Sequence, residues 1–170
     1  SSYQKADLPE QTDLSLLDYA DTATDCTMEK GSEGITVSNL GADPNVVFPG
    51  VASCFADNDK LYGLSLTVDA PDETEMAVYY QTEGDEGFSA EKVYTFKVTE
   101  DNRTWEHLVP GGITELRVDV SSPVESAVIN NFELKSCDIT ESGYTALKES
   151  GVNEVTFSDS TYQAQVTNDA

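Results

Sequence analysis

The residues of this chain that could do chemistry do not fall into a recognisable catalytic pattern. The single histidine, His107, has no identifiable partners for a nucleophile triad, and no GxSxG, HExxH, P-loop or GxGxxG motif occurs. Carboxylates suited to glycoside hydrolysis are so abundant, at 32 Asp and Glu, that no pair stands out. We therefore expect a domain without enzymatic activity and without an organic cofactor.

Calcium is the ion that the sequence could hold. Asp57, Asn58 and Asp59 stand in one predicted loop and offer the hard oxygen ligands that Ca²⁺ prefers, and Asp21 with Asp25 is a second option. The EF-hand pattern is missing, so such a site would be irregular, and the alternative is a solvated loop. Zinc is not expected, because the three cysteines form no CxxC pair and no cluster with the histidine.

Charge is the strongest compositional signal. The 32 acidic residues against 9 Lys and Arg give a formal net charge of -23 over 170 residues. Nucleic acid and anionic lipid are therefore not expected as partners. The pattern is typical of an acidic extracellular or salt-adapted surface, and the alternative is attraction of Ca²⁺ or of a basic partner. No stretch of about 20 apolar residues predicts a membrane span, and the start lacks the features of a signal peptide, which favours an excised or mature segment.

Apolar residues alternate along the chain with the two-residue period of β-strands. This pattern covers most of residues 61–137, and the TEGDEG segment at 82–87 predicts a hairpin, because its glycines can take positive φ. Strands at intervals of roughly 8 to 14 residues, with no long helical period, predict an all-β antiparallel sandwich or jelly roll. The predicted core comprises Leu64, Leu66, Val78, Tyr80, Phe96, Leu116, Val118, Ile129, Phe132 and Leu134.

Changes in composition divide the chain into three parts. Residues 1–32 are polar and aspartate-rich and are predicted to be an N-terminal extension. Residues 33–138 are the predicted sandwich. Residues 139–170 are predicted to be a C-terminal extension, with a short helix at 144–149 followed by a further pair of strands that would begin another element.

The cysteines leave two alternatives open. Three free thiols are expected in a reducing compartment, whereas an exported domain could hold one disulfide and one remaining thiol. The first and last strands of jelly rolls commonly lie side by side. On that basis the predicted bridge joins Cys26, ahead of the first strand, to Cys137, at the end of the last, and leaves Cys54 free.

Several short motifs follow one another in a characteristic order within residues 33–138. They are Tyr79-Tyr80, Gly87-Phe88-Ser89, Leu108-Val109-Pro110, Leu116 to Asp119 and Ile129 to Leu134. This order resembles the galactose-binding-like β-sandwich modules of bacterial glycosyltransferases and multi-spanning membrane proteins of cell-surface polysaccharide assembly. The tail from Val155 is similar to segments of YfhO-type membrane proteins. Where those modules often have a proline after the aspartate, this chain has Val120.

The resemblance implies a carbohydrate site, for which Tyr79 is the first candidate. Sugar-binding sandwiches stack an exposed aromatic ring on the apolar face of a pyranose. Tyr79 and Tyr80 are adjacent, so on a strand they face opposite sides. Because Tyr80 shares the apolar side of the strand with Met76 and Val78, Tyr79 is the one expected at the surface.

Trp105 and Arg117 are the other two candidates, each with a structural alternative. Trp105 stands among polar residues and could stack on a sugar, or it could pack in the core. Arg117 lies between Leu116 and Val118 and so points away from the core. Its guanidinium could bind sugar hydroxyls, or it could pair with one of the many carboxylates.

Three hypotheses about function follow. The first is a non-catalytic, extracellular β-sandwich at the cell surface, which binds carbohydrate or scaffolds a parent membrane protein of polysaccharide assembly. The second is an adhesin-like or pilus-like structural module for protein contact. The third is a glycoside hydrolase domain, which would need two carboxylates facing each other across a cleft. A Trp or Tyr lining a groove favours the first hypothesis, and flat polar faces favour the second.

Overall fold

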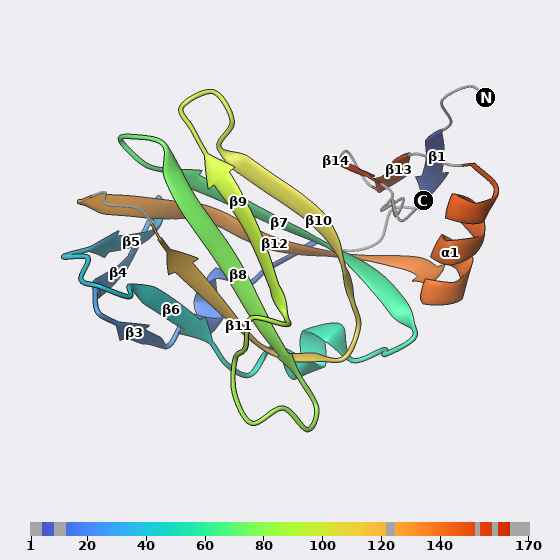
Figure 1. Cartoon of the computed structure of the whole chain (residues 1–170), viewed down its shortest axis with the longest axis horizontal. Coiled ribbons are helices and arrows are strands. Elements are labelled where there is room, and N and C mark those ends of the chain that lie inside the picture. The colour runs from blue at the N-terminus through green and yellow to red at the C-terminus, as the bar shows by residue number, and fades with distance from the viewer. Residues whose placement is uncertain (1–4, 9–12, 122–124, 152–153, 158–159, 164–170) are drawn as a thin grey trace.

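The structure is a computed structural model that describes residues 5–8, 13–121, 125–151, 154–157 and 160–163. Two sheets of antiparallel strands pack face to face, and a small third sheet lies at one end (Figure 1). The predicted all-β antiparallel sandwich is confirmed.

The first large sheet, here called the β7 sheet, has the order β10-β7-β12-β5-β4, and β2 also pairs with β12. Its strands are β2 (Asp13–Ser15), β4 (Thr27–Gly31), β5 (Gly34–Ser38), β7 (Lys60–Asp69), β10 (Thr104–Pro110) and β12 (Ser126–Thr140). The second, the β8 sheet, has the order β3-β6-β11-β8-β9. Its strands are β3 (Thr22–Thr24), β6 (Asn45–Phe48), β8 (Thr74–Thr82), β9 (Val93–Val98) and β11 (Ile113–Val120).

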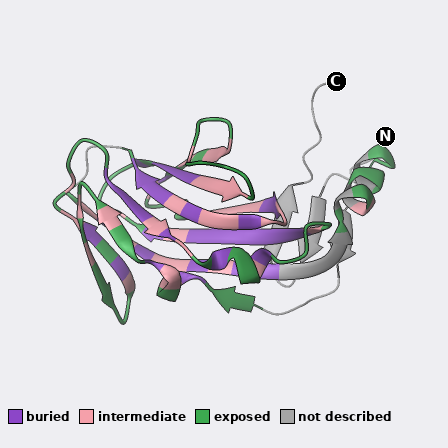
Figure 2. Ribbon diagram, turned by 90° about the horizontal axis from the view of Figure 1, so that it is seen from below, coloured by how far each residue is buried: buried purple, intermediate pink, exposed green. Residues whose placement is uncertain are grey.

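The core lies between the inward faces of these two sheets. Figure 2 shows buried residues along the central strands and exposed residues at the loops. The rings of Phe48 and Phe132, one from each sheet, meet edge to face with their centroids 5.0 Å apart. Of the ten predicted core residues, all are buried except Tyr80 and Phe96, which are partly buried and pack against the core.

The sandwich begins earlier in the chain than the sequence predicted. Strands β2, β3 and β4 fall within residues 1–32, the predicted extension, yet they belong to the two large sheets. These strands have only three to five residues and most of their side chains are exposed. Strands so short and polar carry no detectable apolar alternation, which is why the prediction placed the boundary too late.

The C-terminal part contains the elements that the sequence predicted. The helix α1 (Glu141–Glu149) starts three residues before the predicted one, and a strand pair follows it, β13 (Glu154–Phe157) with β14 (Ser160–Gln163). Strand β1 (Lys5–Leu8) pairs in parallel with β13 and completes the third sheet. Of the helices in the described part of the chain, none has the length and apolar character that a membrane crossing requires.

The predicted disulfide between Cys26 and Cys137 does not fit the structure, in which Cys26 and Cys54 are free thiols. Thr27 pairs with Ser38, and Ser38 pairs with the first residue of β12. Cys26 is therefore level with the start of that 15-residue strand, whereas Cys137 belongs to its other end. The side chain of Cys137 lies outside the described residues. Cys26 instead donates its thiol hydrogen to the carbonyl of Asn45 at 3.6 Å, and burial raises the pKa of this thiol.

Replacement of Leu116 by Ala should lower the free energy of unfolding by about 2 to 5 kcal/mol, because it leaves a cavity in a packed core. Leu116 is 0% exposed, on β11 between Phe48 of β6 and Tyr80 of β8. Chemical denaturation measures the change, with Thr36→Ala at an exposed position of β5 as the control. A midpoint for Leu116→Ala equal to that of the wild type would contradict this placement of β11.

Candidate functional site

The two large sheets differ in what covers their outer faces. Ser65 and Lys135 point outward from the β7 sheet, yet they are only 5% and 4% exposed. The terminal elements lie near that face, since β14 contacts β10 while β1 and α1 contact β12. The outer face of the β8 sheet instead presents exposed side chains, among them Glu75, Thr95 and Lys97. The outer face of the β8 sheet is therefore open to solvent at Glu75, Thr95 and Lys97.

Strand register assembles a defined set of side chains on that accessible face. Along β8, Glu75, Ala77 and Tyr79 point outward, because Met76 and Val78 point into the core. The neighbouring strands place their outward residues directly beside these. The register pairs are Glu75 with Lys97, Ala77 with Thr95, Ala77 with Asp119 and Tyr79 with Arg117.

Arg117 contacts three other side chains on this face. Its guanidinium carbon lies 4.2 Å from the centroid of the Tyr79 ring and 5.0 Å from that of Phe88. Its Nε and Nη2 donate to the two carboxylate oxygens of Asp119 at 2.7 and 3.0 Å. The guanidinium that lies against the Tyr79 ring is thus itself held by the Asp119 carboxylate.

Asp119 is a buried carboxylate, with only 6% of its surface exposed. Burial raises the pKa of its carboxyl group, the bonds from Arg117 act in the opposite direction, and the charge of Asp43 adds to the increase. Asp119 thus serves to position Arg117. Of the two alternatives for Arg117, the ion pair with a carboxylate is the one observed.

A groove of about 510 Å³ crosses the accessible face beside Tyr79. Its walls come from β8, β9 and the residue after β11, and they consist of Glu75, Met76, Ala77, Tyr79, Thr95, Phe96, Lys97 and Ser121. Ala77 is 4% exposed, and its small side chain leaves the depression between Glu75 and Tyr79. Two aromatic residues, hydroxyl groups, a carboxylate and an ammonium group therefore line the same space. Such a mixture suits an uncharged ligand with many hydroxyl groups and an apolar face.

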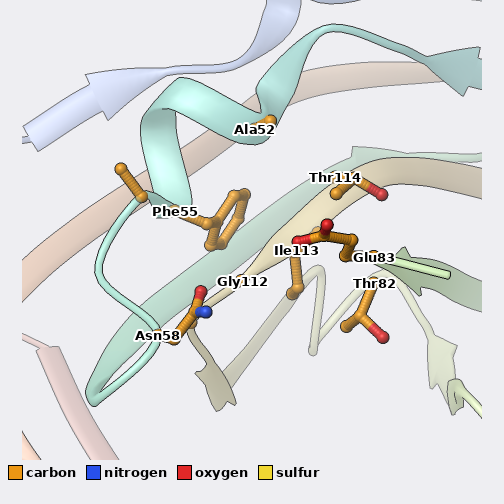
Figure 3. A pocket seen from close by; sticks show the side chains of 10 residues that line it. Ala52, Phe55, Asn58, Thr82, Glu83, Gly112, Ile113 and Thr114 are labelled. Atoms are coloured by element: carbon orange, nitrogen blue, oxygen red, sulfur yellow. The ribbon is translucent and has the colours of Figure 1, made fainter.

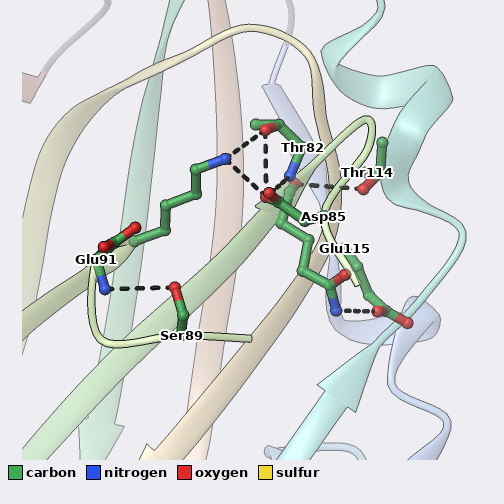
Figure 4. A network of polar contacts seen from close by, with 8 residues as sticks. Thr82, Asp85, Ser89, Glu91, Thr114 and Glu115 are labelled. Carbon is green, nitrogen blue, oxygen red and sulfur yellow. Dashed lines mark hydrogen bonds and ion pairs between the residues drawn. The ribbon is translucent and has the colours of Figure 1, made fainter. Parts of the chain in front are cut away.

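The loop between β8 and β9 places the ring of Phe88 beside Arg117. A network of polar contacts holds that loop (Figure 4). The Asp85 carboxylate accepts hydrogen bonds from the Thr82 amide at 2.8 Å and from Lys92 Nζ at 2.7 Å. Lys92 Nζ also donates to the Thr82 hydroxyl at 2.6 Å. The hydrogen bond from Lys92 lowers the pKa of Asp85, and the amide of Thr82 adds to this effect.

A second hollow, of about 390 Å³, lies at the end of the sandwich (Figure 3). It is bordered by the 3-10 helix η2 (Val51–Phe55), the end of β8 and the turn before β11, and Asn58 and Glu83 supply polar groups. The turn needs glycine, because Gly112 has φ +78° and a Cβ on Gly111 would lie 2.0 Å from a backbone oxygen. Phe55, the aromatic residue among its walls, is 0% exposed. This hollow therefore lacks an aromatic platform.

Trp105 does not join Tyr79 and Arg117. It pairs with Leu66 in the register of β10 and β7, so it lies on the core side of its sheet. Its ring stacks on Phe96 at 4.9 Å and 9° between planes, and Tyr94 lies 5.5 Å away. The contacts join the edge strands β9 and β10 of the two sheets. Of the two alternatives for Trp105, packing against the core is therefore the one observed. The strand register that separates Trp105 from Tyr79 could not be predicted from the sequence.

The residues of the predicted calcium loop make local contacts. The Asp57 carboxylate accepts the amide hydrogen of Asp59 at 3.0 Å, and Asn58 lines the hollow at the end of the sandwich. Within the described residues, no group of three or more His, Cys, Asp or Glu is placed to hold a metal ion. Calcium binding by Asp57, Asn58 and Asp59 stays a prediction.

Comparison with known proteins gives matches in structure alone. No protein-family model matches the chain, and no curated protein does. A low-affinity xylan-binding module, CBM86 of Roseburia intestinalis, is similar with a TM-score of 0.52 and 10% identity, covering 75% of this chain and 95% of that one. The second N-terminal cellulose-binding domain of Cellulomonas fimi β-1,4-glucanase C has a TM-score of 0.51 and 15% identity, covering 76% and 98%.

Two further similar structures differ in how much of their own chain the match covers. The structure named BiXyn10A CBM1 has a TM-score of 0.51 and 11% identity, covering 74% of this chain and 97% of that one. PfGH50B has a TM-score of 0.50 and 10% identity, and there the match covers 73% of this chain but 23% of the other. The chain therefore has the β-sandwich fold found in carbohydrate-binding modules. The fold part of the galactose-binding-like resemblance is supported, and at these identities the likeness concerns the fold alone.

Replacement of Asp85 by Asn should destabilise the protein at neutral pH, because it removes the charge that bonds to Lys92. A carboxylate with a lowered folded pKa stabilises the fold above its unfolded pKa, about 3.9, and loses this contribution as pH falls through the folded value. The deficit of the variant should therefore shrink below about pH 4. Urea titrations at several pH values measure it, with Glu86→Gln in the same loop as the control. A deficit independent of pH would contradict the role of the charge.

Proposed function

We propose that this protein is a non-catalytic carbohydrate-binding module whose binding surface is the groove on the β8 sheet. The observation that carries the proposal is the position of Tyr79. Its ring lies against the Arg117 guanidinium and lines a groove among polar side chains. A side chain that already has contacts in the free protein loses less conformational entropy on binding. More of the free energy of a weak stacking contact then remains as affinity.

The groove offers complementary groups for a sugar chain. A pyranose stacked on Tyr79 would extend along β8 over Ala77, where the small side chain leaves room. Hydroxyl groups could then donate to Glu75 and accept from Lys97, and Thr95 could do either. A volume of about 510 Å³ is within the range of small-molecule sites.

The fold comparisons support this function without extending it to a particular glycan. Among the similar structures, one is named as binding xylan and another as binding cellulose. In the enzyme PfGH50B, the match covers about a quarter of the chain, which is consistent with an accessory module beside a catalytic domain. We infer that the present domain likewise serves a larger protein.

We further propose an extracellular setting, as part of a membrane protein of cell-surface polysaccharide assembly. The acidic composition and the resemblance of residues 33–138 to modules of such proteins support it. The alternative of a structural module for protein contact predicted flat polar faces. The groove beside Tyr79 is an observation that favours carbohydrate instead.

Replacement of Tyr79 by Ala should weaken glycan binding by about two- to tenfold, since an aromatic contact of this kind contributes roughly 0.5 to 1.5 kcal/mol. The measurement is affinity electrophoresis against a panel of soluble polysaccharides, followed by calorimetry with oligosaccharides of the best one. Tyr80→Phe is the matched control, because Tyr80 is the next residue and faces the opposite side of the strand. Equal affinity of Tyr79→Ala and wild type would refute this site.

A further inference from the structure

The turn between β9 and β10 contains a motif that plays no part in the proposed function. Asn102 alone among the asparagines of the chain is followed two residues later by Ser or Thr, here Thr104, with Arg103 between them. The pattern Asn-x-Ser/Thr, in which x is not proline, is the acceptor motif for N-linked glycans and is typical of surface loops in exported proteins. We infer that Asn102 is an N-glycosylation site.

The residues before the motif also fit a bacterial transferase. Bacterial oligosaccharyltransferases commonly require an acidic residue two positions before the asparagine, and Glu100 stands there. Neither Asp101 nor Arg103, on the two sides of Asn102, is a proline. The inference rests on the proposed extracellular setting, where such transferases act, and is independent of the groove on the β8 sheet.

The structure leaves the side chain of Asn102 free to carry a glycan. Asn102 is exposed, and its main chain closes the turn, since its amide donates to the Thr99 carbonyl at 3.2 Å and its carbonyl accepts from the Thr99 amide at 3.0 Å. Among the described residues, no hydrogen bond or ion pair involves its side-chain amide. The turn projects beyond the ends of β9 and β10 (Figure 1), so an attached glycan would extend into solvent without displacing packed side chains.

The donor for this transfer is an oligosaccharide linked through phosphate to a membrane lipid, the substrate class of an oligosaccharyltransferase. The side-chain nitrogen of Asn102 attacks the anomeric carbon of the first sugar. A carbon–nitrogen bond forms while the carbon–oxygen bond to phosphate breaks. The lipid phosphate leaves with the bonding electrons, one amide proton passes to a base of the transferase, and no group is oxidised or reduced.

In the folded protein, the hydroxyl group that the motif supplies is already engaged. Thr104 Oγ1 lies 2.9 Å from Thr67 Oγ1, at the first register pair of β10 with β7. Arg103 is held on the same side, because its carbonyl accepts the amide hydrogen of Val68 at 3.0 Å and its Nη2 donates to Asn130 at 2.8 Å. The transferase must therefore bind the motif before β10 pairs with β7, while the chain is being exported.

The test is export of the full chain, behind an added secretion signal, in a bacterial host that carries an oligosaccharyltransferase and its lipid-linked donor. The intact mass of the purified protein should rise by one glycan, and fragmentation should place that glycan on Asn102. The variants Asn102→Gln and Thr104→Val should lose the added mass completely. Thr104→Ser, which keeps the hydroxyl group, and Asn58→Gln, at an exposed asparagine outside the motif, should retain it. An exported chain without added mass, or a glycan retained by Asn102→Gln, would overturn the inference.

Folded protein produced without the transferase tests the order of events. When it is incubated with the purified enzyme and the same donor, its mass should stay unchanged, because the Thr104 hydroxyl group is already bonded to Thr67. Modification of the folded protein to the same extent as the exported chain would contradict the requirement that transfer precedes folding.

A separate measurement distinguishes failure of the inference from failure of the proposed setting. Labelling of intact cells that naturally produce the protein, with a reagent that does not cross membranes, reports whether the protein is exported. Absence of label would overturn the extracellular setting and, with it, glycosylation of Asn102 in those cells. A labelled protein together with an unmodified chain in the export experiment would overturn the inference alone and leave the setting and the glycan-binding groove unaffected.

Discussion

The side chains of β8 alternate between two environments, and this alternation joins the stability of the sandwich to its candidate binding surface. Met76 and Val78 are buried in the core, while Ala77 and Tyr79 between and beside them face the groove. A shift of one residue in the register would exchange the two sets completely. The packing of the core therefore fixes which side chains the groove displays.

On the neighbouring strand, β11, the Arg117–Asp119 ion pair determines how a side chain is displayed on the same face. A buried ion pair adds little to stability compared with apolar residues, but loss of one partner leaves a charge without compensation. Here the pair lies two residues apart on one strand and holds a guanidinium that contacts the rings of Tyr79 and Phe88. We interpret it as a device for orienting the aromatic surface, with Asp119 as a positioning residue.

The sequence predicted the parts of this arrangement that follow from a local period of two. The fold class, the central core residues, the outward position of Tyr79 and the opposition of Arg117 to the core all follow from alternation along single strands. Asp119 could have been added by the same reasoning, since it follows Arg117 by two residues and so shares its face.

Features that depend on pairing between distant strands escaped the prediction. Trp105 lies at the core side because β10 pairs with β7, and Cys26 is level with the start of β12 because β4 and β5 intervene. Phe88 reaches Arg117 from a loop whose path is set by the contacts of Asp85 and Lys92. Neither composition nor periodicity carries information on such contacts, and the short polar strands before residue 33 lacked an apolar signal altogether.

The central claim is that the outer face of the β8 sheet binds glycan, and mapping of amide chemical shifts by NMR during titration with an oligosaccharide tests it most directly. The account predicts that the amides that shift cluster on residues 75–81 of β8, on β9 and on residues 117–121, with the hollow at Asn58 and Gly112 unaffected. Shifts confined to that hollow, or to the outer face of the β7 sheet, would contradict it.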